Sequence, residues 1–180
     1  MNKTPISLLS MICLLTATLA LTLPAQQAAV FPHLTASNLA KQKMTLPKDF
    51  AGTTNLLLIA FEREQQKDID TWLPAAREIE AAHSTFRYYE LPTIGRSNPV
   101  FRWYLDSAMR SGIQDGTTRS RTITLYVDKQ DFRRTLDIPS ESAISVLLVD
   151  KNGKVLWRAT GNFTEEKKAN LLDEIKAAGA

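Results

Sequence analysis

Residues 143–161 read Ala143-Ile-Ser-Val-Leu-Leu-Val-Asp-Lys-Asn-Gly-Lys-Val-Leu-Trp-Arg-Ala-Thr-Gly161, which is the pattern of two strands joined by a tight turn. The first part, up to Val149, is apolar apart from one serine, and such a run favours a strand that is buried in a sheet. Asn152-Gly153 can adopt positive φ, as the turn of a hairpin requires. The sequence therefore predicts a β-hairpin whose second strand, from Val155 to Ala159, returns antiparallel at one edge of a sheet.

Upstream of this hairpin, strand-like and helical segments alternate. Asn55 to Phe61 is a continuous apolar run of strand length, typical of a central parallel strand. The segment 62–83 has apolar residues at helical spacing and contains Pro74, which is expected to kink the helix. The other expected elements are a strand over 86–91, a helix from Asn98 to about Arg110, a strand over 122–127, a short helix or turn over 128–136, and a last helix capped by Thr164. This alternation implies an α/β fold with a mainly parallel central sheet, an antiparallel C-terminal hairpin edge and flanking helices.

The first 25 residues differ from the rest of the chain. Lys3 is their only charged side chain, and residues 6–24 form an uncharged, largely apolar segment. This pattern is typical of a secretory signal peptide, with cleavage expected after Ala25. An uncleaved N-terminal anchor is the alternative, because about 20 apolar residues can span a bilayer. Both interpretations place the rest of the chain in the periplasm or otherwise outside the cytoplasm. Residues 51–180 are the expected folded domain, and residues 26–50 are a tether, with or without a short strand or helix between Leu34 and Leu46.

The composition excludes several classes of function. The formal net charge is +3, which is too small to indicate a nucleic-acid partner. The only cysteine, Cys13, lies in the segment that is expected to be removed, so the mature domain has no thiol for disulfide or peroxide chemistry. The only histidines are His33 and His83, and zinc sites use more nitrogen or sulfur ligands than these two could supply. We therefore expect neither a metal nor another cofactor.

The order of the elements, the helix proline and the hairpin over 143–161 resemble the thioredoxin-like superfamily, in the form of peroxiredoxins and exported thiol-disulfide reductases. The resemblance covers about residues 46–178. It implies reactive cysteines where the first strand meets the first helix, but aligning the helix proline on Pro74 puts Gln66 and Ile69 at those positions. It also implies a cis-proline near Ile144, where the sequence has none; the nearest, Pro139, would need a shifted register. The resemblance therefore implies the fold of the superfamily without its redox chemistry.

A narrower resemblance concerns the tail from Leu148 to Gly161. Its hairpin, with Trp157 and Arg158 and a final glycine, is similar to the tail of mitochondrial ATP synthase assembly factors, which contain a thioredoxin-like domain. Those proteins are understood as assembly chaperones for membrane subunits of the synthase. This resemblance implies a protein that binds other proteins during assembly.

Two functions from different classes remain open at this point. The first is an exported, non-catalytic domain that acts by protein binding, as an assembly or accessory factor. The second is a degenerate peroxiredoxin-like enzyme that uses carboxylate or metal chemistry near Glu62–Asp70. Four acidic residues gather at this strand–helix junction: Glu62, Glu64, Asp68 and Asp70. Carboxylates near a helix N-terminus are also stabilised by the helix dipole without any catalytic role, and we expect the non-catalytic function.

The segment from Arg96 to Arg134 is rich in arginine, and arginine beside aromatic residues is typical of protein interfaces. If the protein has a surface for a protein partner, we expect it there, through Arg96, Arg102, Trp103, Arg110, Arg119 and Arg121. The helical spacing predicts a buried stripe of Phe101, Tyr104, Leu105 and Ala108, with Arg102, Asp106 and Arg110 facing water and Trp103 at the edge of the stripe. The alternative is a solvated helix face with Trp103 half-buried beneath the helix.

The N-terminal segment predicts export. A reporter that is active only outside the cytoplasm, fused after Lys48, should be active because the apolar run after Lys3 directs the chain across a membrane. The measurement is reporter activity in intact cells. A silent fusion, together with full activity of a reporter that works only in the cytoplasm, would contradict the prediction.

Overall fold

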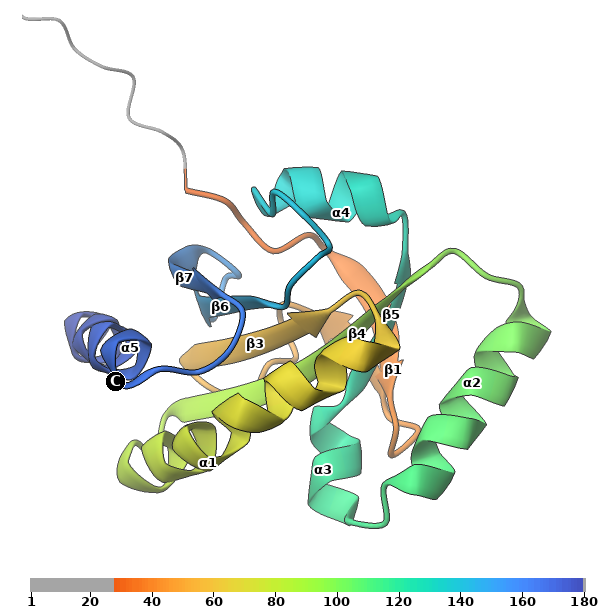
Figure 1. Cartoon of the computed structure of the whole chain (residues 1–180), viewed down its shortest axis with the longest axis horizontal. Coiled ribbons are helices and arrows are strands. Elements are labelled where there is room, and N and C mark those ends of the chain that lie inside the picture. Colours follow the sequence, from red (N-terminus) through yellow and green to blue (C-terminus); the bar gives the residue numbers. More distant parts are fainter. Residues whose placement is uncertain (1–27, 180) are drawn as a thin grey trace, which may run out of the picture.

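A computed structural model of the chain describes residues 28–179; the expected signal peptide, residues 1–25, lies outside them. The described part has one seven-stranded sheet with helices on both of its faces (Figure 1). The strands are β1 (Leu34–Asn38), β2 (Lys43–Leu46), β3 (Thr54–Ala60), β4 (Phe86–Gly95), β5 (Ile123–Val127), β6 (Ser145–Asp150) and β7 (Val155–Thr160). The helices are α1 (Gln66–Ala82), which follows a short 3-10 turn (Arg63–Gln65), α2 (Pro99–Gly112), α3 (Gly116–Arg121), α4 (Lys129–Thr135) and α5 (Glu165–Ala177).

The sheet has the strand order β2-β1-β5-β4-β3-β6-β7. The three middle strands, β5, β4 and β3, run parallel to one another. On one side β6 pairs antiparallel with β3, and β7 with β6. On the other side β1 pairs antiparallel with β5, and β2 with β1. The α/β architecture and the antiparallel C-terminal hairpin edge are as the sequence predicted. The parallel part is limited to the three strands in the middle, because the N-terminal segment adds a second antiparallel edge.

Strand β3 is the centre of the molecule, and every one of its residues is buried. Its side chains alternate between two cores. Leu56 and Leu58 face the core that α1 and α5 cover, and Leu57 and Ile59 face the core that α4 and the N-terminal segment cover. The continuous apolar run in the sequence is thus explained by burial on both faces.

The segment expected to be a tether is instead largely part of the domain. Residues 34–46 form the hairpin β1–β2, and Phe31 and Phe50 are fully buried in the core beside Phe132 of α4. The chain just before β1 also pairs with the far end of the sequence: the Phe31 amide donates to the Gly153 carbonyl at 2.7 Å, and the Val155 amide to the Ala29 carbonyl at 2.8 Å. The polar alternation of these short strands, with one face exposed, is why the sequence indicated no more than a short strand or helix between Leu34 and Leu46.

Local signals placed most of the other elements correctly. Asn98 and Thr164 cap α2 and α5 through their side chains, as expected. Gly153 has a φ of +83° in the turn between β6 and β7, and a Cβ there would meet Pro47 at 2.8 Å. Helix α1 continues through Pro74. Helix α3 is an addition, because the loop before β5 was expected to have no regular structure.

The burial of Phe31 generates a test of where the domain begins. Phe31→Ala should lower the free energy of unfolding by about 3–5 kcal/mol, because it removes a ring in edge contact with Phe50 and Phe132 at centroid distances of 5.5 and 5.8 Å. Urea denaturation of the purified protein measures the change. Val30→Ala is the matched control, because Val30 is 46% exposed, and an equal effect of the two substitutions would contradict the prediction.

Candidate partner-binding surface

Helix α2 lies at one side of the molecule, beyond β5 (Figure 1). It begins where the sequence predicted, because Asn98 accepts a hydrogen bond from the Phe101 amide at 2.9 Å and Pro99 occupies the first turn. It ends at Gly112, and a short connection leads to α3, which is capped by Asp115.

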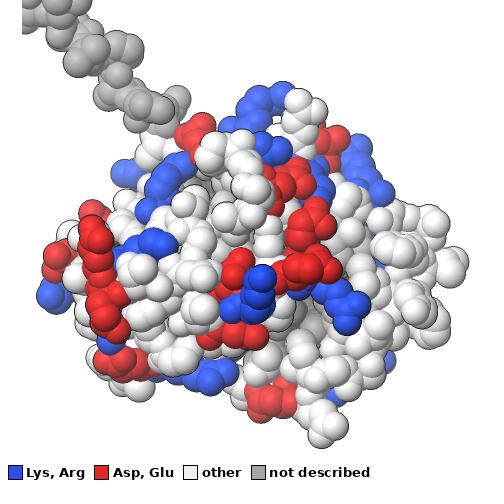
Figure 2. Space-filling model, in the orientation of Figure 1, with Lys and Arg blue, Asp and Glu red and all other residues white. Residues whose placement is uncertain are grey.

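The buried stripe predicted for α2 is wrong: the helix is turned with its apolar face to water. Phe101 is 46% exposed, Trp103 70% and Tyr104 64%, Ala108 is also exposed, and no residue of the helix is fully buried. Of the predicted stripe only Leu105 is half-buried. The side of the molecule where α2 lies is accordingly mostly white in Figure 2, at the right.

The residues expected to face water hold α2 onto the domain instead. The Arg102 guanidinium lies over the Tyr126 ring at 4.9 Å. The Tyr126 hydroxyl donates to the Asp106 carboxylate at 2.8 Å, and burial and this carboxylate together raise the pKa of Tyr126. The Arg110 Nε donates to the Leu39 carbonyl at 2.8 Å. These three contacts fix the orientation of the helix.

The surface beneath α2 explains this orientation. Strand β5 directs Ile123 and Leu125 into the core on the opposite face of the sheet, so Tyr126 is the side chain that meets α2. The Tyr126 hydroxyl needs a hydrogen-bond partner, which Asp106 supplies, and the Tyr126 ring attracts the Arg102 guanidinium. An apolar side chain such as Phe101 could provide neither contact. The helical period of the sequence identified an amphipathic helix correctly, but it carries no information about which face the rest of the fold will cover.

Helix α3 joins α2 to the sheet through two arginines. The Arg119 Nη2 donates to the Arg110 carbonyl at 3.0 Å. Arg121 forms an ion pair with Glu80 of α1 at 2.7 Å, and its guanidinium lies over the Tyr88 ring at 4.4 Å. Burial alone would lower the pKa of Arg121, but the Glu80 carboxylate outweighs it, so the net direction is upward and the guanidinium is charged.

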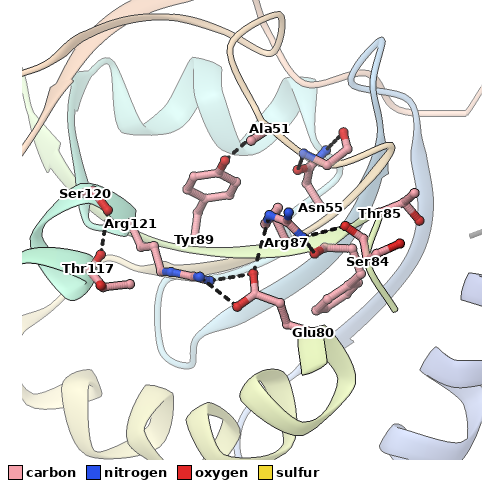
Figure 3. Close-up of polar contacts among 12 residues, drawn as sticks. Ala51, Asn55, Glu80, Ser84, Thr85, Arg87, Tyr89, Thr117, Ser120 and Arg121 are labelled. Atoms are coloured by element: carbon pink, nitrogen blue, oxygen red, sulfur yellow. Dashed lines mark hydrogen bonds and ion pairs between the residues drawn. The ribbon is translucent and has the colours of Figure 1, made fainter. Parts of the chain in front are cut away.

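Beside Arg121 a cavity of about 500 Å³ opens between the β1–β2 hairpin and the first residues of β4. Figure 3 shows Arg121 and Arg87 converging on Glu80. In the same view the Tyr89 hydroxyl accepts a hydrogen bond from the Ala51 amide at 2.8 Å. The cavity is lined by Asn38, Gln42, Lys43, Met44, Asp49, Ala51, Arg87, Tyr88, Tyr89, Ser120 and Arg121.

The six residues expected to form one surface thus divide into three groups. Arg121 lines the cavity; Arg102, Arg110 and Arg119 fasten α2 and α3; Arg96 and Trp103 are exposed. The sequence did not indicate the remaining cavity residues. They come from four separate segments, and nothing local to any of them marks a site.

At the other end of the parallel strands lies the junction where the superfamily has its redox site. Gln66 is exposed and Ile69 fully buried, and Ile144 is also fully buried. Gln65 is buried between the segment of the cysteine positions and the segment of the cis-proline position. It accepts a hydrogen bond from the Phe61 amide at 2.8 Å and donates to the Glu141 carbonyl at 2.6 Å. An amide therefore joins β3 to the loop before β6. Among residues 28–179 the one cis peptide bond is Leu46–Pro47, far from this loop.

The acidic residues of the junction form separate contacts. Lys129 lies 3.5 Å from the Glu62 carboxylate and 2.7 Å from that of Glu141, and it lowers the pKa of Glu141. Asp70 accepts a hydrogen bond from Gln66 at 3.1 Å. Within the part of the chain that the structure describes, no three possible metal ligands come together.

Comparisons with known proteins agree with this architecture. A family model described as ATP10 protein matches residues 20–177. Among solved structures, the thioredoxin domain of a thiol-disulfide oxidoreductase from Bacteroides vulgatus has 17% identity and a TM-score of 0.52, over 83% of this chain and 96% of that one.

Two Sco proteins are similar in the same way. BsSco, a member of the Sco family of cytochrome c oxidase assembly proteins, has 12% identity and a TM-score of 0.56, over 84% of this chain and 94% of that one. ScoI from Arabidopsis thaliana, solved with copper bound, has 10% identity and a TM-score of 0.56, over 83% and 99%. At such identities the likeness establishes the fold alone, and it confirms the thioredoxin-like prediction. A search of curated proteins gives no match.

Glu90, in the middle of β4, gives a test of the junction. Its carboxylate is 5% exposed and accepts a hydrogen bond from Gln66 at 3.1 Å; burial raises its pKa, and Asp70 adds to the effect. Because the folded-state pKa is the higher one, the protein loses stability as pH rises through that pKa. Glu90→Gln should therefore raise the free energy of unfolding at pH 7 by on the order of 1 kcal/mol.

The gain should shrink as the pH is lowered to the ordinary range of a glutamate, where the wild-type carboxyl is protonated in both states. Urea denaturation at pH 4 and pH 7 measures this difference. Glu64→Gln, at an exposed position next to the junction, is the control. A gain for Glu90→Gln that is the same at both pH values would refute the assignment of a costly buried charge.

Proposed function

This chain belongs to the ATP10 protein family, and we propose that it acts as a non-catalytic assembly or accessory factor that binds a protein partner outside the cytoplasm. The members of the family are ATP synthase assembly factors, which implies protein partners. The partner that we propose is a subunit of ATP synthase. Catalysis is not needed for this role, since binding energy alone can hold a subunit until it is assembled.

The contrast between the two ends of the sheet carries the proposal. At the redox end, the two thiol positions hold Gln66 and Ile69, and Gln65 ties the junction together. A thiolate is the nucleophile in disulfide and peroxide chemistry, and neither an amide nor an isoleucine side chain can replace it. At the opposite end, charged and aromatic side chains from several elements surround an open cavity. The polar cavity therefore lies at the end of the sheet opposite to the junction that corresponds to the redox site of the superfamily.

We propose that the protein partner binds at this cavity, which the end of α3 lines together with the β1–β2 hairpin and the start of β4. Lys43, Arg87 and Arg121 line it, against Asp49 alone among acidic lining residues. Glu80 already neutralises part of the charge of the two arginines, so Lys43, which is exposed, contributes the least compensated charge. Such a rim suits an acidic loop or an acidic chain end, because complementary charge speeds encounter and fixes register.

The location outside the cytoplasm rests on the N-terminal sequence. Residues 6–24 have no charge and follow Lys3, as a signal peptide or an anchor does. In the first case the domain is free after export, and in the second it is held at the membrane. Both are compatible with a factor that meets a membrane-bound complex.

Reversing the charge at the cavity rim tests the proposal. Lys43→Glu should weaken capture of the partner from the native membrane fraction by about tenfold, because it opposes an acidic partner with like charge. The measurement is the amount of partner recovered with the tagged full-length chain, identified by mass spectrometry and quantified against wild type.

Lys151→Glu, at an exposed lysine in the β6–β7 turn, is the matched control and should leave capture unchanged. The thermal unfolding of both variants should match wild type, because neither side chain is buried. Equal capture by wild type and Lys43→Glu would move the interface away from the cavity. The absence of any specific partner would reject the function itself.

A further inference from the structure

The exposed apolar surface of the protein is concentrated on one helix. Among the described residues, the large hydrophobic side chains that are exposed are Val30, Val100, Phe101, Trp103 and Tyr104. Four of these five belong to α2, with exposed fractions from 46% to 75%. Isolated exposed apolar residues need no explanation, but a contiguous patch marks a surface that contacts something other than water.

The patch is held outward by the contacts on the other side of α2. Arg102 and Asp106 are bound to Tyr126, and Arg110 to the Leu39 carbonyl. Turning the helix over would break all three contacts and would place Trp103 and Tyr104 against the polar tip of Tyr126. The aromatic face is therefore a fixed feature of the folded protein.

Positive charges outnumber negative ones near the patch. Asp106, the one acidic residue of α2, faces Tyr126, and Asp115 caps α3 by accepting from the Thr118 amide. Arg96 is exposed beside the start of the helix. Arg110 and Arg119 donate to carbonyl groups, and in residues 28–179 the ion pairs of α2 and α3 are confined to Arg121, so these two keep their positive charge.

An exposed aromatic face on a helix with a net positive charge nearby is typical of a helix that lies in a membrane interface. Tryptophan and tyrosine have an apolar body and a polar tip and concentrate at the level of the lipid headgroups. A helix of 14 residues is about 21 Å long, too short to cross a bilayer. None of the helices in the described part of the chain has the length and hydrophobicity to span one. A helix with these properties is suited to lie along the surface.

We infer that α2 docks on an anionic lipid surface, with Val100, Phe101, Trp103 and Tyr104 at the boundary between headgroups and acyl chains. Arg96, Arg110 and Arg119 supply the positive potential that attracts the acidic headgroups. The inference goes beyond the proposed function. A protein that rests on a bilayer through α2 leaves its cavity free, so that a membrane-bound partner can reach Lys43 and Arg121.

The test uses the full-length chain and Trp103 as its own probe. The other tryptophans are Trp72, which is fully buried, and Trp157, which lies in β7 and packs against the core, and residues 1–27 contain none. Vesicles are made of phosphatidylcholine alone or with about one-third phosphatidylglycerol, each with and without brominated acyl chains. Brominated chains quench a tryptophan only at close range, so quenching reports on α2 and not on the N-terminal segment.

We expect brominated, anionic vesicles to quench the fluorescence, with an affinity at least about tenfold above that for neutral vesicles and falling with added salt. Trp103→Phe should abolish the quenching while keeping the binding. Val100→Asn combined with Tyr104→Asn should lower the affinity by about tenfold or more, because it removes buried apolar area while keeping the probe. Val30→Asn should behave as wild type, since Val30 is the one exposed large apolar residue outside α2 among residues 28–179.

The contrary outcomes are equally definite. Bound protein without quenching of Trp103 would mean that another segment contacts the lipid, and equal quenching on neutral vesicles would mean that the arginines play no part. Either result overturns the inference, as does the absence of binding. If a photo-crosslinker at position 103 reacts with a protein while vesicles do not quench Trp103, the face binds protein instead. Since vesicles contain no protein, these results leave the capture experiment on the cavity untouched.

Discussion

The burial of β3 on both faces and both edges is the constraint on which the rest of the structure depends. Seven consecutive residues without solvent contact need a hydrogen-bonded strand on each side and an apolar layer above and below. The strands β4 and β6 meet the first need. The second need is met by α1 and α5 on one face, and by α4 with Phe31 and Phe50 on the other. Helix α2 does not cover β3 and is free of this constraint. It can therefore expose its apolar face, unlike a helix that covers the core.

The same distinction explains how much could be predicted from the sequence. The apolar runs that became β3 and β6, the caps Asn98 and Thr164, and the Asn152-Gly153 turn carry local signals, and they were predicted correctly. The hairpin β1–β2 alternates over only a few residues, and its pairing with β5 is a contact between distant segments. The orientation of α2 depends on Tyr126 and the Leu39 carbonyl, two groups beneath it that come from other parts of the chain. The cavity likewise forms from segments that only the folded chain brings together, so no sequence pattern marks it.

The junction that corresponds to the redox site of the superfamily and the proposed binding cavity lie at different ends of the strands. In the fold of the structural relatives, the junction after the first central strand is where cysteines react. Here the buried amide of Gln65 bridges that junction, and Lys129 neutralises its carboxylates. The contacts of Gln65 and Lys129 thus connect β3, α4 and the loop before β6 at this junction.

The pairing of residues 29–31 with residues 153–155 has a consequence for a chain that crosses a membrane from its N-terminus. The first part of the domain to emerge finds its partners only after more than a hundred further residues have followed. Until then, Phe31 and the edge of β1 have no core to join. Such long-range closure favours late, cooperative folding over stepwise folding during translocation. Under the proposed export, the domain would therefore leave the channel unfolded, which is the state that a threading secretion pathway requires.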